Sequence, residues 1–131
     1  MNARHIIDTC HRHFVTLSRV GDGIELEPLF PEDFPMPVEL VDDVRRHKNE
    51  ILVWLDYEVQ ADALLLESTR RIAVMWVPGC DLDTPEWEAH ETALHDAYWS
   101  ENLDRLKAVF HKREAYALSV FEHHRNKAHH V

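Results

Sequence analysis

Apolar and polar residues alternate in two short runs near the start of the chain, which is the pattern of a half-buried β-strand. The first run is Phe14–Val20, the second is Ile24–Pro28, and Gly21-Asp22-Gly23 lies between them. Glycine supplies the positive backbone dihedrals of a tight turn without steric cost. This segment therefore predicts an antiparallel β-hairpin. In the first strand we expect Val15, Leu17 and Arg19 on one face and Thr16, Ser18 and Val20 on the other. In the second we expect Ile24 and Leu26 on one face and Glu25 and Glu27 on the other.

The flanking segments show the spacing of amphipathic helices. Ile6, Ile7 and Cys10 predict a short first helix over residues 3–11. A rigid, proline-rich connection follows the hairpin, and residues 38–77 then contain no glycine or proline. A single helix of that length is uncommon in a compact domain, so we expect a break near His47 or Asp56.

The second half predicts two further helices that form an αα-hairpin against residues 61–77. Thr84 is followed by Pro85 and Glu86, a hydroxyl cap with proline and an acid in the first turn. Ser100 is expected to cap the last helix. Four tryptophans spread through these helices are expected to join them in one core (Trp54, Trp76, Trp87 and Trp99).

These elements predict an α+β fold that is mostly helical. Residues 1–56 form an αββαα unit, a β-hairpin on helices. Residues 57–131 form a helical region that packs on it, and together they make one compact domain of ordinary size.

Composition and cysteine content narrow the class of protein. Of the 131 residues, 45 % are hydrophobic, and no apolar run approaches the roughly 18–20 residues that cross a bilayer. The first residues lack the apolar stretch of a signal peptide. Cys10 and Cys80 are too few for a disulfide framework, so we expect buried thiols, with a single bridge as the alternative. We expect a cytoplasmic protein without a membrane partner.

The net charge of −10 is unevenly placed. Eight acidic residues and no lysine or arginine lie between Arg19 and Arg45, and the same holds between Arg71 and Arg105. Phosphate binding needs clustered cations, so nucleic-acid binding is disfavoured. Such windows favour a basic protein partner, and solvated helix faces are the plainer explanation.

Candidate chemistry is sparse. His90, Glu91 and His95 come close to a zinc-protease helix motif, but ligands at i and i+5 lie about 140° apart around a helix. His123, His124, His129 and His130 form a histidine-rich tail. There is no phosphate-binding glycine loop and no nucleophile with a recognisable elbow. We therefore expect no enzyme activity, no cofactor and no metal site.

Residues 3–56 resemble the N-terminal docking domain first described in TubC, which is found on nonribosomal peptide synthetase and polyketide subunits. The pattern is carried by Val15, Leu17, Gly21, Asp22, Ile24 and Leu26, and then by Pro37, Leu40, Val44, Arg46-His47-Lys48, Glu50-Ile51-Leu52 and Leu55. The family usually has a glycine before the first strand, where this chain has His13-Phe14. The resemblance implies an αββαα fold whose exposed hairpin edge captures a peptide from a partner.

Our leading hypothesis is a small docking or adaptor module that takes up a partner's polar or basic segment at the hairpin. The candidate partner-binding residues are Thr16, Ser18, Val20, Ile24, Glu25 and Glu27. One alternative is an acidic mobile-element inhibitor that mimics nucleic acid. Another is a metal-dependent enzyme at His90, Glu91 and His95. The sequence leaves a homodimer open.

Overall fold

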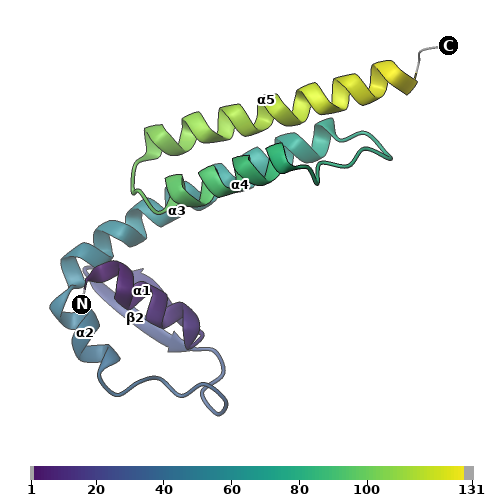
Figure 1. Cartoon of the computed structure of the whole chain (residues 1–131). Coiled ribbons are helices and arrows are strands. Elements are labelled where there is room, and N and C mark those ends of the chain that lie inside the picture. The colour runs from purple at the N-terminus through teal and green to yellow at the C-terminus, as the bar shows by residue number, and fades with distance from the viewer. Residues whose placement is uncertain (1, 129–131) are drawn as a thin grey trace. The chain divides into compact units, whose positions relative to one another are not determined.

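The computed structural model describes residues 2–128, which form five helices and one two-stranded antiparallel hairpin (Figure 1). The expectation of a mostly helical chain with a β-hairpin is confirmed. The described chain divides between Glu58 and Val59 into two compact units, called here the N-terminal and the C-terminal unit. The elements are α1 (Ala3–Arg12), β1 (Val15–Val20), β2 (Gly23–Pro28), α2 (Leu40–Arg46), α3 (Lys48–Met75), α4 (Pro85–Tyr98) and α5 (Leu103–Ala128).

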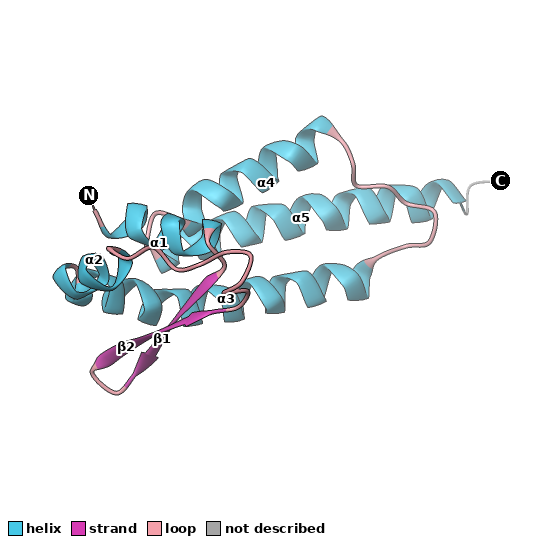
Figure 2. Ribbon diagram, turned by 90° about the horizontal axis from the view of Figure 1, so that it is seen from below, coloured by secondary structure: helices cyan, strands magenta, loops and turns pink. Residues whose placement is uncertain are grey.

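The hairpin is closed by the two-residue turn Gly21-Asp22. Strand β1 pairs with β2 in a register that sets Val20 opposite Gly23 and Val15 opposite Pro28. Gly21 has a φ of 59°, which a two-residue turn with glycine at its first central position requires. Figure 2 shows the turn pointing away from the helices that flank the strands.

One face of the hairpin and three helices build the core of the N-terminal unit. Helix α1 begins at Asn2, whose side chain accepts a hydrogen bond from the His5 amide, and it packs against β1 and α2. The core residues are Ile6, Ile7, Cys10, Val15, Leu40, Val44, Ile51 and Trp54, all at most 5 % exposed. Helix α2 ends at Arg46 with His47 as its C-cap, so the break expected near His47 or Asp56 falls at His47, and α3 runs past Asp56 without a break.

Caps define the helices of the C-terminal unit. The Thr84 hydroxyl accepts a hydrogen bond from the Trp87 amide at 3.2 Å, so the predicted start of α4 is confirmed. The prediction for the last helix is wrong by two residues. Asn102 accepts from the Arg105 amide, whereas the Ser100 hydroxyl donates to the Ala97 carbonyl at the end of α4.

The C-terminal unit buries a stripe from each helix. Leu94, Leu106, Phe110, Ala117 and Phe121 are its main buried apolar residues. The expectation that the four tryptophans join the helices in one core is wrong, because Trp54 is buried in the N-terminal unit and the other three belong to the C-terminal unit. Trp87 and Trp99 are half-buried, and Trp76 is 52 % exposed. Trp76 lies just beyond α3, and its indole N–H donates to the Cys80 carbonyl, which holds the ring over the turn.

Both cysteines are free and buried, so the thiol expectation is confirmed and the bridge is not formed. Burial raises the pKa of the Cys10 thiol to about 11, although a backbone hydrogen bond lowers it in part. A thiol of that pKa stays protonated at neutral pH and is unreactive. Within residues 2–128, none of the helices combines the length and the apolarity needed to cross a membrane.

Candidate functional site

The two outer edges of the hairpin have unpaired backbone groups. The Leu29 amide donates to the Phe14 carbonyl at 2.9 Å, which makes this a hydrogen-bonded pair. Hydrogen-bonded and non-hydrogen-bonded pairs alternate in an antiparallel ladder. The register therefore directs the backbone N–H and C=O groups of Leu17 and Arg19 outward on β1, and those of Ile24 and Leu26 outward on β2. In the described chain, none of these four residues forms a backbone hydrogen bond outside the hairpin.

Five of the six candidate partner-binding residues share one face. Thr16 lies opposite Glu27, Ser18 opposite Glu25, and Val20 stands at the end of the same row. All five side chains are exposed. Ile24 is the exception: it lies opposite Arg19 on the other face, where it is half-buried. The other five residues thus form the outer face of the hairpin, and Ile24 does not belong to it.

A pocket of about 330 Å³ lies along the edge of β1 and is called here the β1-edge pocket. Three consecutive strand residues, Val15, Thr16 and Leu17, line it. Neighbouring side chains of a strand point to opposite faces, so a space that all three reach must lie at the edge of the strand. Its other walls come from α1, α3 and the residues beside the strands (Ile7, His11, Phe14, Leu29, Trp54, Leu55 and Glu58).

A second groove, of about 270 Å³, lies between β2 and α2 and is called the β2 groove. Ile24, Leu26 and Val44 form its apolar part, and Arg45 and Lys48 supply its cations. Arg45 also forms an ion pair with Asp42 at 3.1 Å. The β1-edge pocket instead contains the carboxylate of Glu58, which accepts from the Trp54 indole N–H. The pockets beside the two edges therefore differ in charge.

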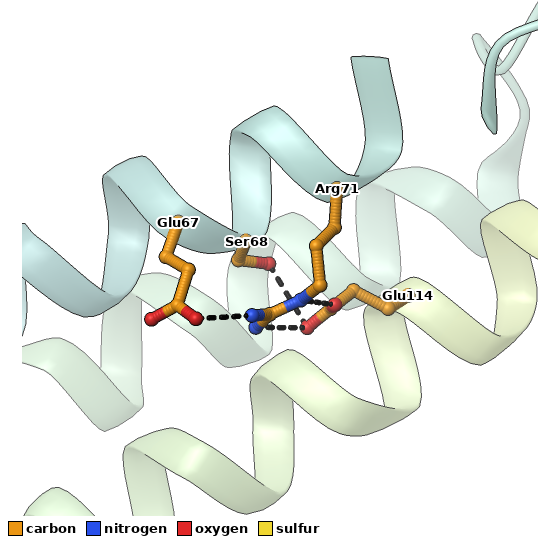
Figure 3. Close-up of polar contacts among 4 residues, drawn as sticks. All are labelled: Glu67, Ser68, Arg71 and Glu114. Carbon is orange, nitrogen blue, oxygen red and sulfur yellow. Dashed lines mark hydrogen bonds and ion pairs between the residues drawn. The ribbon is translucent and has the colours of Figure 1, made fainter. Parts of the chain in front are cut away.

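A further cavity, of about 640 Å³, belongs to the C-terminal unit and lies between α3 and α5. Val74, Met75 and Leu118 are among its apolar lining residues. Figure 3 shows its polar side, where Arg71 on α3 contacts Glu67 on the same helix and Glu114 on α5. The Ser68 hydroxyl also donates to Glu114, at 3.2 Å.

Two carboxylates share one guanidinium in this group of residues. Partial burial raises the pKa of Glu114, but hydrogen bonds from Arg71 and Ser68 and the charge of Arg71 lower it by more, so the net pKa lies below its ordinary value. The same hydrogen bond to Glu114 raises the pKa of Arg71. An ionised carboxylate already held by an arginine is a poor general base at neutral pH. The contact between Arg71 and Glu114 links α3 to α5.

The residues of the proposed metal site are not brought together. The Glu91 carboxylate accepts from Arg113 at 2.8 Å, and the His90 ring packs on Tyr116. His95 lies beside Asp96 and Trp99 instead. Within the described part of the chain, no three metal-ligating side chains gather at one point. The histidine-rich tail is described only as far as His124 on α5, since His129 and His130 lie outside the described residues.

One feature of the site was missed from the sequence. Three phenylalanine rings meet beside the β1-edge pocket: Phe14 is 5.6 Å from Phe30 and 4.6 Å from Phe34 between ring centroids. We call these rings, together with Leu29, the phenylalanine patch. The signal was present in the proline-rich segment that follows β2, where Leu29, Phe30 and Phe34 are apolar residues without helix or strand periodicity.

Comparison with known proteins adds no relative: no family model, no curated protein and no solved structure matches the chain.

Proposed function

We propose that the protein is an interaction module that captures an extended segment of a partner protein along its β-hairpin. The observation that carries this proposal is a hairpin with two unpaired edges, each beside a groove. A peptide that adds as a strand satisfies the outward N–H and C=O groups, and its alternate side chains reach the groove. Backbone pairing supplies affinity, and the groove supplies selectivity.

The resemblance to the TubC-type docking domain supports this function. The N-terminal unit has the element order α-β-β-α-α. The His47-Lys48 step falls where α2 ends and α3 begins, and Ile51 of the same motif is fully buried. Phe14 stands near the position of the family's glycine and has a φ of 53°, a conformation that glycine adopts without strain. The backbone of this chain thus keeps a glycine-like turn in the absence of the glycine.

The experiment is a pair of single proline variants. Leu17→Pro removes an outward N–H from β1, and Ile24→Pro removes one from β2, while the hydrogen bonds inside the hairpin remain. We expect one of the two to lose the partner that the unaltered chain captures from its native cell, as followed by mass spectrometry. A peptide array of that partner should trace binding to one short segment.

Val38→Pro serves as the control, because Val38 is 89 % exposed and lies between the hairpin and α2. Circular dichroism establishes that all three variants are folded. Full capture by both strand variants would refute the proposal.

A second candidate, an acidic inhibitor that mimics nucleic acid, is favoured by the exposed carboxylates of the C-terminal unit. Asp81, Asp83, Glu86, Glu88 and Asp96 are all exposed. Mimicry depends on exposed surface charges, which salt screens. Binding should therefore weaken steeply as salt is raised through about 0.1–0.15 M, where the Debye length is about 8–10 Å. Peptide capture by backbone pairing should change little over that range. A partner whose affinity is insensitive to salt excludes the mimic.

A further inference from the structure

The backbone of Phe14 is strained. A φ of 53° is rare for any residue with a side chain and is an outlier for a bulky one. The conformation is held from both sides, since the Phe14 amide donates to the His11 carbonyl and its own carbonyl accepts from the Leu29 amide. Strain of this kind persists where the surrounding structure fixes it and is enriched at binding sites.

The side chain of this strained residue is not buried. Phe14 is 43 % exposed, Phe34 is 40 % exposed, and Phe30 and Leu29 are each 52 % exposed. The core of the N-terminal unit therefore gains little from these side chains. A contiguous apolar patch of this kind on a small unit is a mark of an interaction surface.

The phenylalanine patch continues into the β1-edge pocket, because Phe14 and Leu29 line both. Val15 and Trp54 form buried walls of this pocket. At about 330 Å³ it is near the lower end of the range for ligand sites, about 300–1,000 Å³. That size fits one large side chain better than a cofactor.

The geometry of β1 sets which side chain of a guest strand enters. A strand added beside Leu17 has side chains that alternate as those of β1 do. Residues on the inner face lie beside Val15 and Leu17 and reach the pocket. Residues on the outer face lie beside Thr16 and Ser18, across which Glu27 and Glu25 stand.

The carboxylates on the outer face of the hairpin indicate which charge is favoured in the partner residues that flank the inward-pointing side chain. Glu25 and Glu27 are exposed and form no ion pair within the described chain. They stand across β1 from an added strand, two strand spacings or roughly 10 Å away. Extended lysine or arginine side chains next to the inward-pointing residue reach across Thr16 and Ser18 to these carboxylates. The β2 groove has the opposite character, since Arg45 and Lys48 line it.

We propose that the β1 edge is the docking edge and that it binds an extended segment with one large apolar side chain between two basic residues. The apolar side chain enters the β1-edge pocket against Phe14 and Leu29. This inference rests on the proposed function and adds the edge, the anchor and the charge of the partner.

The test uses the full chain, labelled with nitrogen-15, and two synthetic peptides, Ac-Val-Thr-Lys-Phe-Lys-Thr-Val-NH2 and its matched form with both lysines replaced by glutamate. We expect the lysine peptide at about 1 mM to shift the amide resonances of Leu17 and Arg19, because millimolar affinity needs only about 4 kcal/mol. Replacing the peptide's phenylalanine with alanine should weaken binding about tenfold, as expected for an anchor residue.

Two protein variants separate the anchor from general effects. Leu29→Ala should weaken binding of the lysine peptide about fivefold to tenfold, because it removes one wall of the pocket. Val38→Ala removes an exposed apolar side chain outside the patch and should leave binding unchanged. Neither position is buried, so both variants should keep the spectrum of the unaltered fold.

Three outcomes overturn the inference. Shifts confined to Ile24 and Leu26, with preference for the glutamate peptide, would assign docking to β2 and leave the proposed function standing. Binding at β1 that is unaffected by Leu29→Ala would remove the anchor. Absence of binding by the lysine peptide would refute the inference, whereas the proposed function fails separately if both proline variants capture the partner.

Discussion

Phe14 has two unfavourable features: its backbone lies in the left-handed region, and its ring is 43 % exposed. The left-handed conformation costs a residue with a Cβ roughly 1–2 kcal/mol. Contacts with Phe30 and Phe34 return part of that, and they tie the proline-rich connection to the start of β1. The remaining cost is consistent with a residue kept for contact with a partner.

The strain at Phe14 can be measured by comparing two variants. At an ordinary strand position glycine is less stable than alanine by about 0.5–1 kcal/mol. At Phe14 we expect the reverse: Phe14→Gly should be more stable than Phe14→Ala by about 1 kcal/mol in urea denaturation, since both lose the ring and only alanine keeps the strain. The same pair of substitutions at Ser18, which lies within β1, should show the usual order. Equal stability of the two Phe14 variants would mean that the left-handed backbone is not a constraint.

At the scale of elements, Thr84 joins two helices of the C-terminal unit. Its hydroxyl caps α4 and also lies 2.7 Å from the Tyr116 hydroxyl on α5. We expect Thr84→Ala to lower the free energy of unfolding by about 1–2 kcal/mol, because a cap and an interhelical hydrogen bond are both lost. Thr84→Ser keeps the hydroxyl and should cost much less. Urea denaturation followed by helical circular dichroism measures both, and a serine variant as unstable as the alanine variant would exclude the hydrogen-bonding role.

The contact of α3 with α5 should depend on pH. The pKa of Glu114 is lower in the folded chain than its ordinary value of 4.5, so the unfolded chain binds more protons between the two values. The stabilisation from Glu114 is therefore complete above about pH 4.5 and is lost as the pH falls through the folded pKa. Glu114→Gln should be less stable than the unaltered chain at pH 6, and the difference should shrink towards pH 3. Glu67→Gln removes a more exposed partner of Arg71 and should have a smaller effect, whereas a difference for Glu114→Gln that is constant with pH would refute the assignment.

The elements were largely predictable, and their ends and contacts less so. Alternation and the Gly21 turn are local signals, so the hairpin and the alternation within each strand followed from sequence alone. Ser100 failed as a cap because Asn102 offers an equivalent acceptor two residues later, and local preference cannot choose between them. The phenylalanine patch was missed because its rings meet across a connection without periodicity. Ile24 was grouped with the outer face although its alternation places it on the inner one.

On the scale of the whole molecule, the chain consists of two compact units that divide within α3. Each unit has buried residues of its own, Ile6 and Ile51 in the first and Phe110 and Phe121 in the second. A helix whose ends belong to different cores has no single packing partner. We infer that damage to one core is felt first by the elements of its own unit.

Phe110→Ala tests this. Removing a buried phenylalanine costs about 3–5 kcal/mol, so the amides of α4 and α5 should lose protection from hydrogen exchange by a corresponding factor. The amides of α1 and β1 should change less. Ile7→Ala is the reciprocal variant and should act mainly on the N-terminal unit. Equal loss of protection throughout the chain in both variants would show that the units unfold as one.

The unpaired edges of the hairpin also have a consequence for handling the protein. An open strand edge is a template for any other chain, including identical ones, and charged side chains are the usual protection against fibril growth. Here the exposed Glu25 and Glu27 on β2 provide that protection. Concentrated stocks of a variant that combines Glu25→Gln with Glu27→Gln should therefore form thioflavin-positive aggregates sooner than the unaltered chain.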